Sequence, residues 1–345
     1  AGLPDVEVNV RNIAVGGAGV GEVTSQSDAG RDLLGITAFV PFAAPGEHVL
    51  ARVEEKKDRY LKAELVEVLE PSPARVMPSC RYFTNCGGCE LQHLSYAAQC
   101  EAKFEMLRGS LQAAKFGKDV LSALVPLVPS QELNYRRRVT LHVDGSGRIG
   151  LYRSRSRSIV PIESCSVATP RINDALSALS LFGAELPSKK LSSILLEEDD
   201  QGLVAILKSP YDLTRSEVDV ILEKVKRVFP NLVLIAAGKE VGGAGRQILE
   251  LPLNDKKTFF LRLPAGYFSQ VNWNINLSLI KRVVEAARLS YGDKVYDLYA
   301  GAGNFTLPLA RAGGQVTAVE CDSRLAGFGR DNIKRHNLEK KVLFL

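Results

Sequence analysis

Apolar and polar residues alternate in short segments through the first 70 residues of the chain, with glycine-rich turns between them. The segments cover residues 6–10, 15–21, 36–42, 48–53 and 61–69. Alternation with a period of two is typical of strands that bury one face. Five such strands in so short a stretch indicate a small β-barrel. We therefore predict a barrel domain over residues 1–70, which ends at a Pro71-Ser72-Pro73 linker.

The middle of the chain has a less regular pattern. Apolar positions recur with helical spacing from Leu91 to Leu111, and strands and helices mix without repetition from Val139 to about Pro264. This mixture is typical of an α+β domain. We assign that domain to residues 71–265.

Beyond Gly266, helical and strand patterns alternate. Helices are expected at residues 275–289, 305–312 and 324–336, and strands at residues 294–298, 315–320 and 342–345. Alternation of strand and helix predicts a parallel, doubly wound sheet. The predicted fold class is therefore multidomain α/β, with a Rossmann-like third domain over residues 266–345.

The composition of the 345 residues excludes several classes of protein. With 46% hydrophobic and 24% charged residues, the chain is neither disordered nor collagen-like. Its longest apolar stretch, Leu232 to Ala237, is shorter than the ~18 residues that a membrane helix needs. The first residues also lack the pattern of a signal peptide. We expect a cytoplasmic protein with no membrane contact.

The net charge of +5 is unevenly distributed. Residues 1–70 carry a net charge of −5, residues 71–165 carry +6 and the remainder carries +4. Between Asn134 and Arg157 there are seven arginines and a single acid, Asp144. The seven are Arg136, Arg137, Arg138, Arg148, Arg153, Arg155 and Arg157. This distribution indicates a local basic patch in the middle of the chain.

Part of the basic patch has the alternation of a strand. If residues 151–160 form one strand, Arg153, Arg155 and Arg157 lie on the same face. Such a face can block aggregation of an edge strand, or it can bind the phosphates of a nucleic acid. The nearby run Arg136–Arg138 favours the second interpretation. A phosphate-binding face contacts the backbone of the nucleic acid and reads no sequence.

Three of the six cysteines form a tight motif. Cys80, Cys86 and Cys89 follow the spacing Cys-x5-Cys-Gly-Gly-Cys, which can point several thiolates at one metal centre. The spacing leaves zinc and an iron–sulfur cluster both open. Cys165 is the best candidate for a fourth ligand, whereas Cys100 lies in the predicted helix and suits packing. A disulfide framework is not expected in a cytoplasmic chain of this size.

A glycine turn follows the first strand of the third domain. Gly301 and Gly303 lie between that strand and the next helix, where they allow a ligand to approach the backbone closely. Asp297 ends the first strand and Glu320 ends the second, where a carboxylate can accept both hydroxyls of a ribose. Thr306 stands where a dinucleotide-binding loop has its third glycine. The pattern favours S-adenosylmethionine, which has no pyrophosphate, over a tight turn without a ligand.

Taken in order, these motifs resemble those of the RNA (uracil-5-)-methyltransferases that carry a TRAM domain and a [4Fe-4S] cluster. The resemblance runs through nearly the whole chain. It is carried by the four cysteines, Glu90–His93, Tyr135–Arg138, Gly266–Asn272, Asp297–Tyr299 and Asn304–Thr306. It implies an OB-like TRAM barrel, an α+β central domain with the iron–sulfur cluster, and a class I methyltransferase domain that uses S-adenosylmethionine.

The resemblance also implies roles for individual residues. The expected cofactor contacts are Gln270, Tyr299, Asn304 and Glu320, with Asp297, Gly301 and Gly303 completing the site. The expected cluster ligands are Cys80, Cys86, Cys89 and Cys165. The helix over about residues 91–123 is expected to pack on the methyltransferase domain. The family often has phenylalanine and cysteine where this chain has Tyr299 and Ala300, and neither change implies lost binding of the cofactor.

Methylation of uracil at C5 needs two further groups. A cysteine thiolate attacks C6, the activated C5 takes the methyl group, and a general base removes the C5 proton. In the family, the nucleophile is the cysteine of a Ser-Cys-Asn-Pro segment, and the base is a glutamate. An Asp-Pro-Pro-like loop precedes both. None of these segments occurs in this sequence. Cys321 follows Glu320 and is expected to be a packing residue. We therefore name no catalytic residue.

A methyltransferase sheet of this class needs more strands than the three predicted after Gly292. We therefore expect that the carboxyl-terminal part of the catalytic domain is missing and that the chain as given is inactive. The expected function is methylation of C5 of a specific uridine in RNA by a monomer, with ribosomal RNA favoured over transfer RNA. The alternative is a non-catalytic RNA-binding iron–sulfur protein. A radical enzyme would use Cys-x3-Cys-x2-Cys, so a closed cluster fits the cysteines better.

Overall fold

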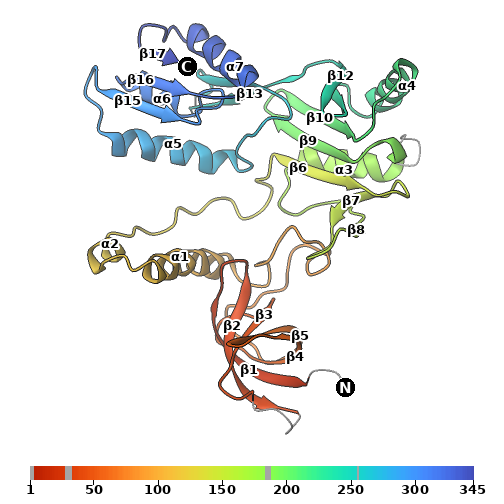
Figure 1. Ribbon diagram of the computed structural model, residues 1–345, viewed down its shortest axis with the longest axis vertical. Coiled ribbons are helices and arrows are strands. Elements are labelled where there is room, and N and C mark those ends of the chain that lie inside the picture. Colours follow the sequence, from red (N-terminus) through yellow and green to blue (C-terminus); the bar gives the residue numbers. More distant parts are fainter. Residues whose placement is uncertain (1–3, 28–32, 183–187, 255) are drawn as a thin grey trace. The chain divides into compact units, whose positions relative to one another are not determined.

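The computed structural model describes residues 4–27, 33–182, 188–254 and 256–345 (Figure 1). The chain divides into two compact units. Unit 1 runs to Pro129 and also contains Tyr152–Arg157, and unit 2 contains Ser130–Leu151 and Ser158–Leu345. The middle region predicted over residues 71–265 is therefore shared between the units. Its cysteine-rich first part belongs with the barrel, and its second part belongs with the carboxyl-terminal sheet.

Unit 1 contains the predicted five-stranded barrel. Its strands are β1 (Asp5–Ile13), β2 (Ala18–Gln26), β3 (Thr37–Pro41), β4 (His48–Lys56) and β5 (Tyr60–Glu70). They close in the order β1-β2-β3-β5-β4, in which β3 and β5 are parallel and the other pairs are antiparallel. Alternate side chains point inward, so Val6, Val8 and Val10 of β1 are buried in the core. The prediction of a small barrel is confirmed.

The segment after the barrel is held against it by a buried ion pair. The side chain of Glu47 is fully buried and pairs with Arg75. Arg75 Nη2 donates to Glu47 Oε2 at 2.8 Å and to the Phe42 carbonyl at 2.7 Å. Because a buried carboxylate is costly without a partner, this pair fixes the chain on both sides of the predicted linker. Unit 1 therefore extends well beyond the barrel.

Two helices follow in unit 1, α1 (Tyr96–Ala113) and α2 (Lys118–Ser122). The hydroxyl of Ser95 caps α1 by accepting a hydrogen bond from the N–H of Ala98 at 3.4 Å. The apolar contacts of α1 within unit 1 join Ala98, Ala102 and Met106 to a small core of Ile13, Ala44 and Leu94. The first half of α1 thus packs beside the barrel. Its expected packing on the methyltransferase domain stays a prediction.

Unit 2 begins with a seven-stranded sheet in the order β12-β11-β10-β9-β6-β7-β8. Its strands are β6 (Arg138–Val143), β7 (Ile149–Tyr152), β8 (Ile159–Val160), β9 (Ser193–Asp199), β10 (Gly202–Ser209), β11 (Leu232–Ala236) and β12 (Lys239–Ala244). Helix α3 (Pro170–Phe182) packs on β9 and β10, and α4 (Arg215–Lys226) packs on β11 and β12 (Figure 1). A short 3-10 helix, η2 (Ser188–Lys190), precedes β9. A hairpin of β13 (Ile248–Pro252) and β14 (Phe260–Pro264) follows the sheet.

The carboxyl-terminal elements match the predicted alternation closely. They are α5 (Trp273–Ala287), β15 (Lys294–Leu298), α6 (Thr306–Arg311), β16 (Gln315–Val319), α7 (Ser323–Arg335) and β17 (Val342–Phe344). The strands are parallel in the order β15-β16-β17, as predicted. Their core is continuous with the β13–β14 hairpin and with the larger sheet, through residues such as Ile206, Leu263 and Leu307. This core therefore joins the carboxyl-terminal sheet and the hairpin to one face of the seven-stranded sheet.

The three-stranded sheet buries one face and exposes the other. Val316 and Ala318 of β16 are buried, whereas Tyr296, Leu298 and Leu343 are exposed. The expectation that further strands complete this sheet stays a prediction. Within the described ranges, no helix combines the length and the apolar character that crossing a bilayer requires.

The predicted strand over residues 151–160 is wrong. β7 ends at Tyr152, and residues 153–157, which we call the arginine turn, reverse the chain before β8. The Ser156 N–H donates to the Arg153 carbonyl at 3.1 Å, and Arg155 has a φ of 54°. The three arginines of this turn therefore do not share one face of a strand.

Candidate functional site

The glycine turn between β15 and α6 is open at Gly301, whereas Ala302 and Gly303 are buried. Tyr299, Gly301 and Gly303 have φ values of 60°, 57° and 105°, a conformation that glycine adopts without strain and tyrosine does not. A Cβ added at Gly301 would meet no atom within 4 Å. The side chain of Tyr299 is 91% exposed. The turn can therefore receive a ligand against its backbone.

Two carboxylates hold the glycine turn in place. Asp297 Oδ2 accepts a hydrogen bond from Thr306 Oγ1 at 2.5 Å, and burial raises the pKa of Asp297. Glu320 Oε2 accepts from the Gly301 N–H at 2.8 Å, and Glu320 Oε1 accepts from the Asp322 N–H at 2.9 Å. Hydrogen bonds from the backbone, Asp322 first, lower the pKa of Glu320. The structure thus brings Asp297, Glu320 and the turn together, as the sequence predicts.

Glu320 keeps the capacity to bind a ribose. An ionised carboxylate has about four lone-pair sites. The two backbone N–H groups occupy two of them, and the thiol of Cys321, a weak donor, lies 3.6 Å from Oε1. The side chain is half-buried beside a turn whose backbone is open at Gly301. These residues therefore fit the adenosine part of S-adenosylmethionine. The neighbouring Cys321 is exposed, so its expected role in packing is wrong.

Two buried asparagines support the site, Asn276 and Asn332, and neither was predicted from the sequence. Asn276 of α5 and Asn304 of the turn exchange amide hydrogen bonds of 2.9 Å and 3.0 Å. Asn332 of α7 donates to the Ala302 carbonyl at 3.0 Å. Both Asn276 and Asn332 are 1% exposed. Each of these asparagines lies on the apolar face of a predicted helix. Because buried amides need hydrogen-bond partners, this position could have indicated a structural role from the sequence.

Gln270 lies in an exposed loop between β14 and α5. The loop is residues 265–272, and we call it the Gln270 loop. The Arg137 N–H donates to the Val271 carbonyl at 2.9 Å, and Asn272 Oδ1 caps α5 by accepting from the Ile275 N–H at 3.1 Å. The two separate sequence motifs Tyr135–Arg138 and Gly266–Asn272 therefore form one local structure.

The predicted basic patch divides into neutralised and uncompensated arginines. In unit 2, ion pairs join Arg137 to Asp200 at 3.2 Å, Arg138 to Glu197 at 2.6 Å and Arg148 to Asp144 at 2.8 Å. Arg136 Nε donates to the Arg138 carbonyl at 2.9 Å. In the arginine turn of unit 1, Arg155 lies 4.0 Å from Glu54 with both side chains exposed. No described carboxylate lies within that distance of Arg153 or Arg157. The turn therefore carries the stronger positive field.

The cysteine loop, residues 80–89, is the partner of the arginine turn within unit 1. The Gly87 N–H donates to the Tyr152 carbonyl at 2.9 Å, and Arg153 Nη1 donates to Asn85 Oδ1 at 3.0 Å. A Cβ at Gly87 would lie 3.1 Å from the Cα of Ser154, so the close approach favours glycine. Asn85 is neutral, so this contact orients Arg153 without cancelling its charge.

The four cysteines predicted to bind a metal are divided between the two units. Cys80, Cys86 and Cys89 are half-buried in unit 1, and Cys165 is half-buried in unit 2. Among the described residues, no group of three or more histidine, cysteine, aspartate or glutamate side chains is arranged to hold a metal ion. Cys100 is half-buried in α1, consistent with packing.

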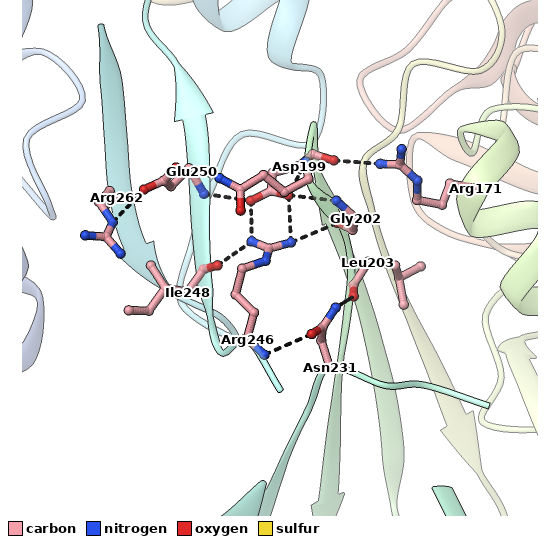
Figure 2. Close-up of polar contacts among 10 residues, drawn as sticks. Arg171, Asp199, Gly202, Leu203, Asn231, Arg246, Ile248, Glu250 and Arg262 are labelled. Atoms are coloured by element: carbon pink, nitrogen blue, oxygen red, sulfur yellow. Dashed lines mark hydrogen bonds and ion pairs between the residues drawn. The ribbon is translucent and has the colours of Figure 1, made fainter. Parts of the chain in front are cut away.

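A buried carboxylate on β9 ties three strands together (Figure 2). Asp199 accepts two hydrogen bonds from Arg246, at 2.5 Å and 2.8 Å. It also accepts from the N–H groups of Gln201, Gly202 and Glu250 at 2.9 Å, 3.1 Å and 2.7 Å. Arg246 Nη1 donates to the Ile248 carbonyl as well. The pair joins the β9–β10 turn to β13.

Comparison with known proteins places these features in a family. The model of the TRAM domain matches residues 5–66, which form the barrel. The model of the ribosomal RNA adenine dimethylases matches residues 268–343, which contain residues 268–272 of the Gln270 loop and the whole glycine turn. The chain is 32% identical over 323 residues to the 23S rRNA (uracil(1939)-C(5))-methyltransferase RlmD of Shewanella sediminis, covering 90% of this chain and 71% of that protein. The chain belongs to this family of RNA uracil-C5 methyltransferases.

Other relatives agree with this assignment. RlmD of Shewanella woodyi is 29% identical over 322 residues, again covering 90% of this chain and 71% of that protein. The crystal structure of Pyrococcus abyssi tRNA (uracil-54, C5)-methyltransferase, in complex with S-adenosyl-L-homocysteine, has a TM-score of 0.70 and 23% identity. It covers 97% of this chain and 78% of that one, and it shows that the two share a fold. The expected absence of a carboxyl-terminal part stays a prediction.

Proposed function

We propose that this member of the uracil-C5 methyltransferase family transfers a methyl group from S-adenosylmethionine to C5 of a uridine in RNA, with ribosomal RNA as the favoured substrate. The main support is the glycine turn with Glu320 beside it, in a chain 32% identical to an RlmD enzyme over 90% of its length. The names of the RlmD relatives favour ribosomal over transfer RNA.

The cofactor proposal assigns a part of the site to each residue. Glu320 accepts the ribose hydroxyls, and the open space at Gly301 lets the cofactor lie against the backbone. Tyr299, Asn304 and Gln270 provide further contacts, and Asp297 fixes the turn through Thr306. The sulfonium of S-adenosylmethionine supplies an electrophilic methyl group. The cysteine and the base of the family are not assigned to residues of this chain.

Loss of hydrogen from C5 tests the proposed chemistry. The reaction contains the product of the complete gene, S-adenosylmethionine and ribosomal RNA labelled with tritium at C5 of uridine. One equivalent of tritium should be released into the solvent for each methyl group transferred. The reason is that the base must remove the C5 proton after the methyl group is added. Methyl transfer without release of tritium would mean that another atom is methylated.

The arginine turn is proposed to bind the phosphate backbone of RNA. The positive charge of Arg153, Arg155 and Arg157 is little compensated. The described partner of Arg153 is the neutral Asn85, and that of Arg155 is the exposed Glu54 at 4.0 Å. The left-handed Arg155 stands at the tip of the turn and is exposed. Arg136 and Arg137 are also proposed to face RNA, although Arg137 is paired with Asp200. The arginine turn should therefore contribute the larger share of the salt dependence.

Replacement of Arg155 by alanine should weaken binding to single-stranded RNA of any sequence and reduce the salt slope of log K by about 1. The measurement is fluorescence anisotropy of a labelled RNA oligonucleotide at several salt concentrations. The matched control is Arg227→Ala, which removes one exposed arginine that pairs with Glu223 on α4. Equal salt slopes for the two variants would contradict the role of the arginine turn.

A [4Fe-4S] cluster held by Cys80, Cys86, Cys89 and Cys165 also stays a proposal. Its support comes from the sequence alone, namely the spacing of the cysteines and the resemblance of the surrounding motif. The described side chains form no metal site. Protein purified without oxygen should contain iron and absorb at about 400 nm. Colourless protein that contains zinc instead would contradict the proposal.

A further inference from the structure

The carboxylates of two arginine–carboxylate pairs lie on strand β9. The two pairs are similarly buried, but they bind different segments of the chain. The Glu197 side chain is 1% exposed and its partner Arg138 is 21% exposed, with 2.6 Å between Oε1 and Nη1. The Asp199 side chain is 0% exposed and its partner Arg246 is 22% exposed, with 2.5 Å between Oδ2 and Nη1. The second pair holds β13, as described above (Figure 2). The first pair holds the Gln270 loop.

Both members of the Glu197–Arg138 pair bind the backbone of the Gln270 loop. Glu197 Oε2 accepts a hydrogen bond from the Gly266 N–H at 2.5 Å. Arg138 donates to the carbonyl of Tyr267, and its Nη2 donates to the carbonyl of Gly266 at 3.4 Å. Gly266 has a φ of 91°, so the chain turns sharply where the pair holds it. The pair therefore fixes the first part of the loop on β9.

Side chains support the start of the loop as well, because Ala265 is buried in the core of unit 2 and the Arg324 guanidinium lies 5.7 Å from the centroid of the Tyr267 ring. Phe268 is 75% exposed and Gln270 is exposed, so neither packs into the core. At the far end, the loop is held by the Arg137–Val271 backbone bond and by the cap of α5 at Asn272. A loop fixed at both ends presents its middle residues in a defined position, whereas a loop released at one end samples many conformations.

We infer that Arg138 and Glu197 are positioning residues for the cofactor, which act by fixing the loop that carries Gln270. The inference rests on the proposed contact between Gln270 and the cofactor. It gives Arg138 a role other than the RNA contact expected from the sequence, because its charge is compensated by Glu197 and its N–H groups are used by the loop.

The test compares the two pairs of β9 by calorimetric titration of the purified protein with S-adenosylhomocysteine. Arg138→Met should weaken binding about tenfold, because the loop loses its fixed position. Glu197→Gln should weaken it less, since the glutamine oxygen can still accept from the Gly266 N–H. Arg246→Met is the matched control. It breaks an equally buried pair on the same strand and should lower the melting temperature while leaving the affinity at 25 °C unchanged.

Three further measurements separate this inference from its alternatives. The double variant Arg138→Met with Gln270→Ala should bind no more weakly than Gln270→Ala alone, because Arg138 acts through the same group. Additive losses would overturn the inference, as would unchanged affinity in Arg138→Met. If Gln270→Ala itself binds normally, the proposed cofactor contact fails. If Arg138→Met loses RNA affinity but keeps S-adenosylhomocysteine affinity, Arg138 contacts RNA instead.

Discussion

Replacement of Asp199 by alanine should lower the free energy of unfolding by about 3–5 kcal/mol, the usual cost of removing one partner of a buried ion pair. Asp199 is fully buried and accepts hydrogen bonds from Arg246 and from three backbone N–H groups (Figure 2). Alanine leaves the guanidinium without its counter-charge and the N–H groups without acceptors. Each of these groups then bears its cost of desolvation.

Equilibrium unfolding in urea measures this effect. Asp199→Asn should fall between the wild-type protein and Asp199→Ala, because the amide keeps one acceptor and loses the charge. The matched control is Asp219→Ala on α4, which removes an exposed pair with Arg215 at 3.3 Å. That change should cost no more than about 0.5 kcal/mol. A loss in Asp199→Ala as small as in the control would contradict the structural role of the network.

The sequence was sufficient wherever a local pattern determines the structure. The five barrel strands follow from alternation, because a strand that faces a core shows its period in its own residues. The elements from α5 to β17 follow in the same way. The pairing of Glu320 with the Gly301 turn was also predictable, since adjacent parallel strands bring their carboxyl ends to one edge.

The sequence was insufficient where a distant residue decides the structure. The arginine turn has the alternation of a strand, but its Ser154 N–H donates to the carbonyl of Asn85, far away in the sequence. Arg138 belongs to a basic run, but Glu197 lies opposite it across the sheet and cancels its charge. The boundary expected at Pro71-Ser72-Pro73 is bridged by the buried pair of Glu47 and Arg75. None of these partners can be chosen from local spacing.

The central claim is that the protein methylates C5 of uridine in ribosomal RNA, and mapping of 5-methyluridine in cells tests it most directly. RNA from cells that lack the complete gene should lose 5-methyluridine at one position of the large ribosomal RNA, and the restored gene should return it. Loss in transfer RNA instead would change the substrate assignment. An unchanged set of 5-methyluridines in both RNA classes would contradict the claim.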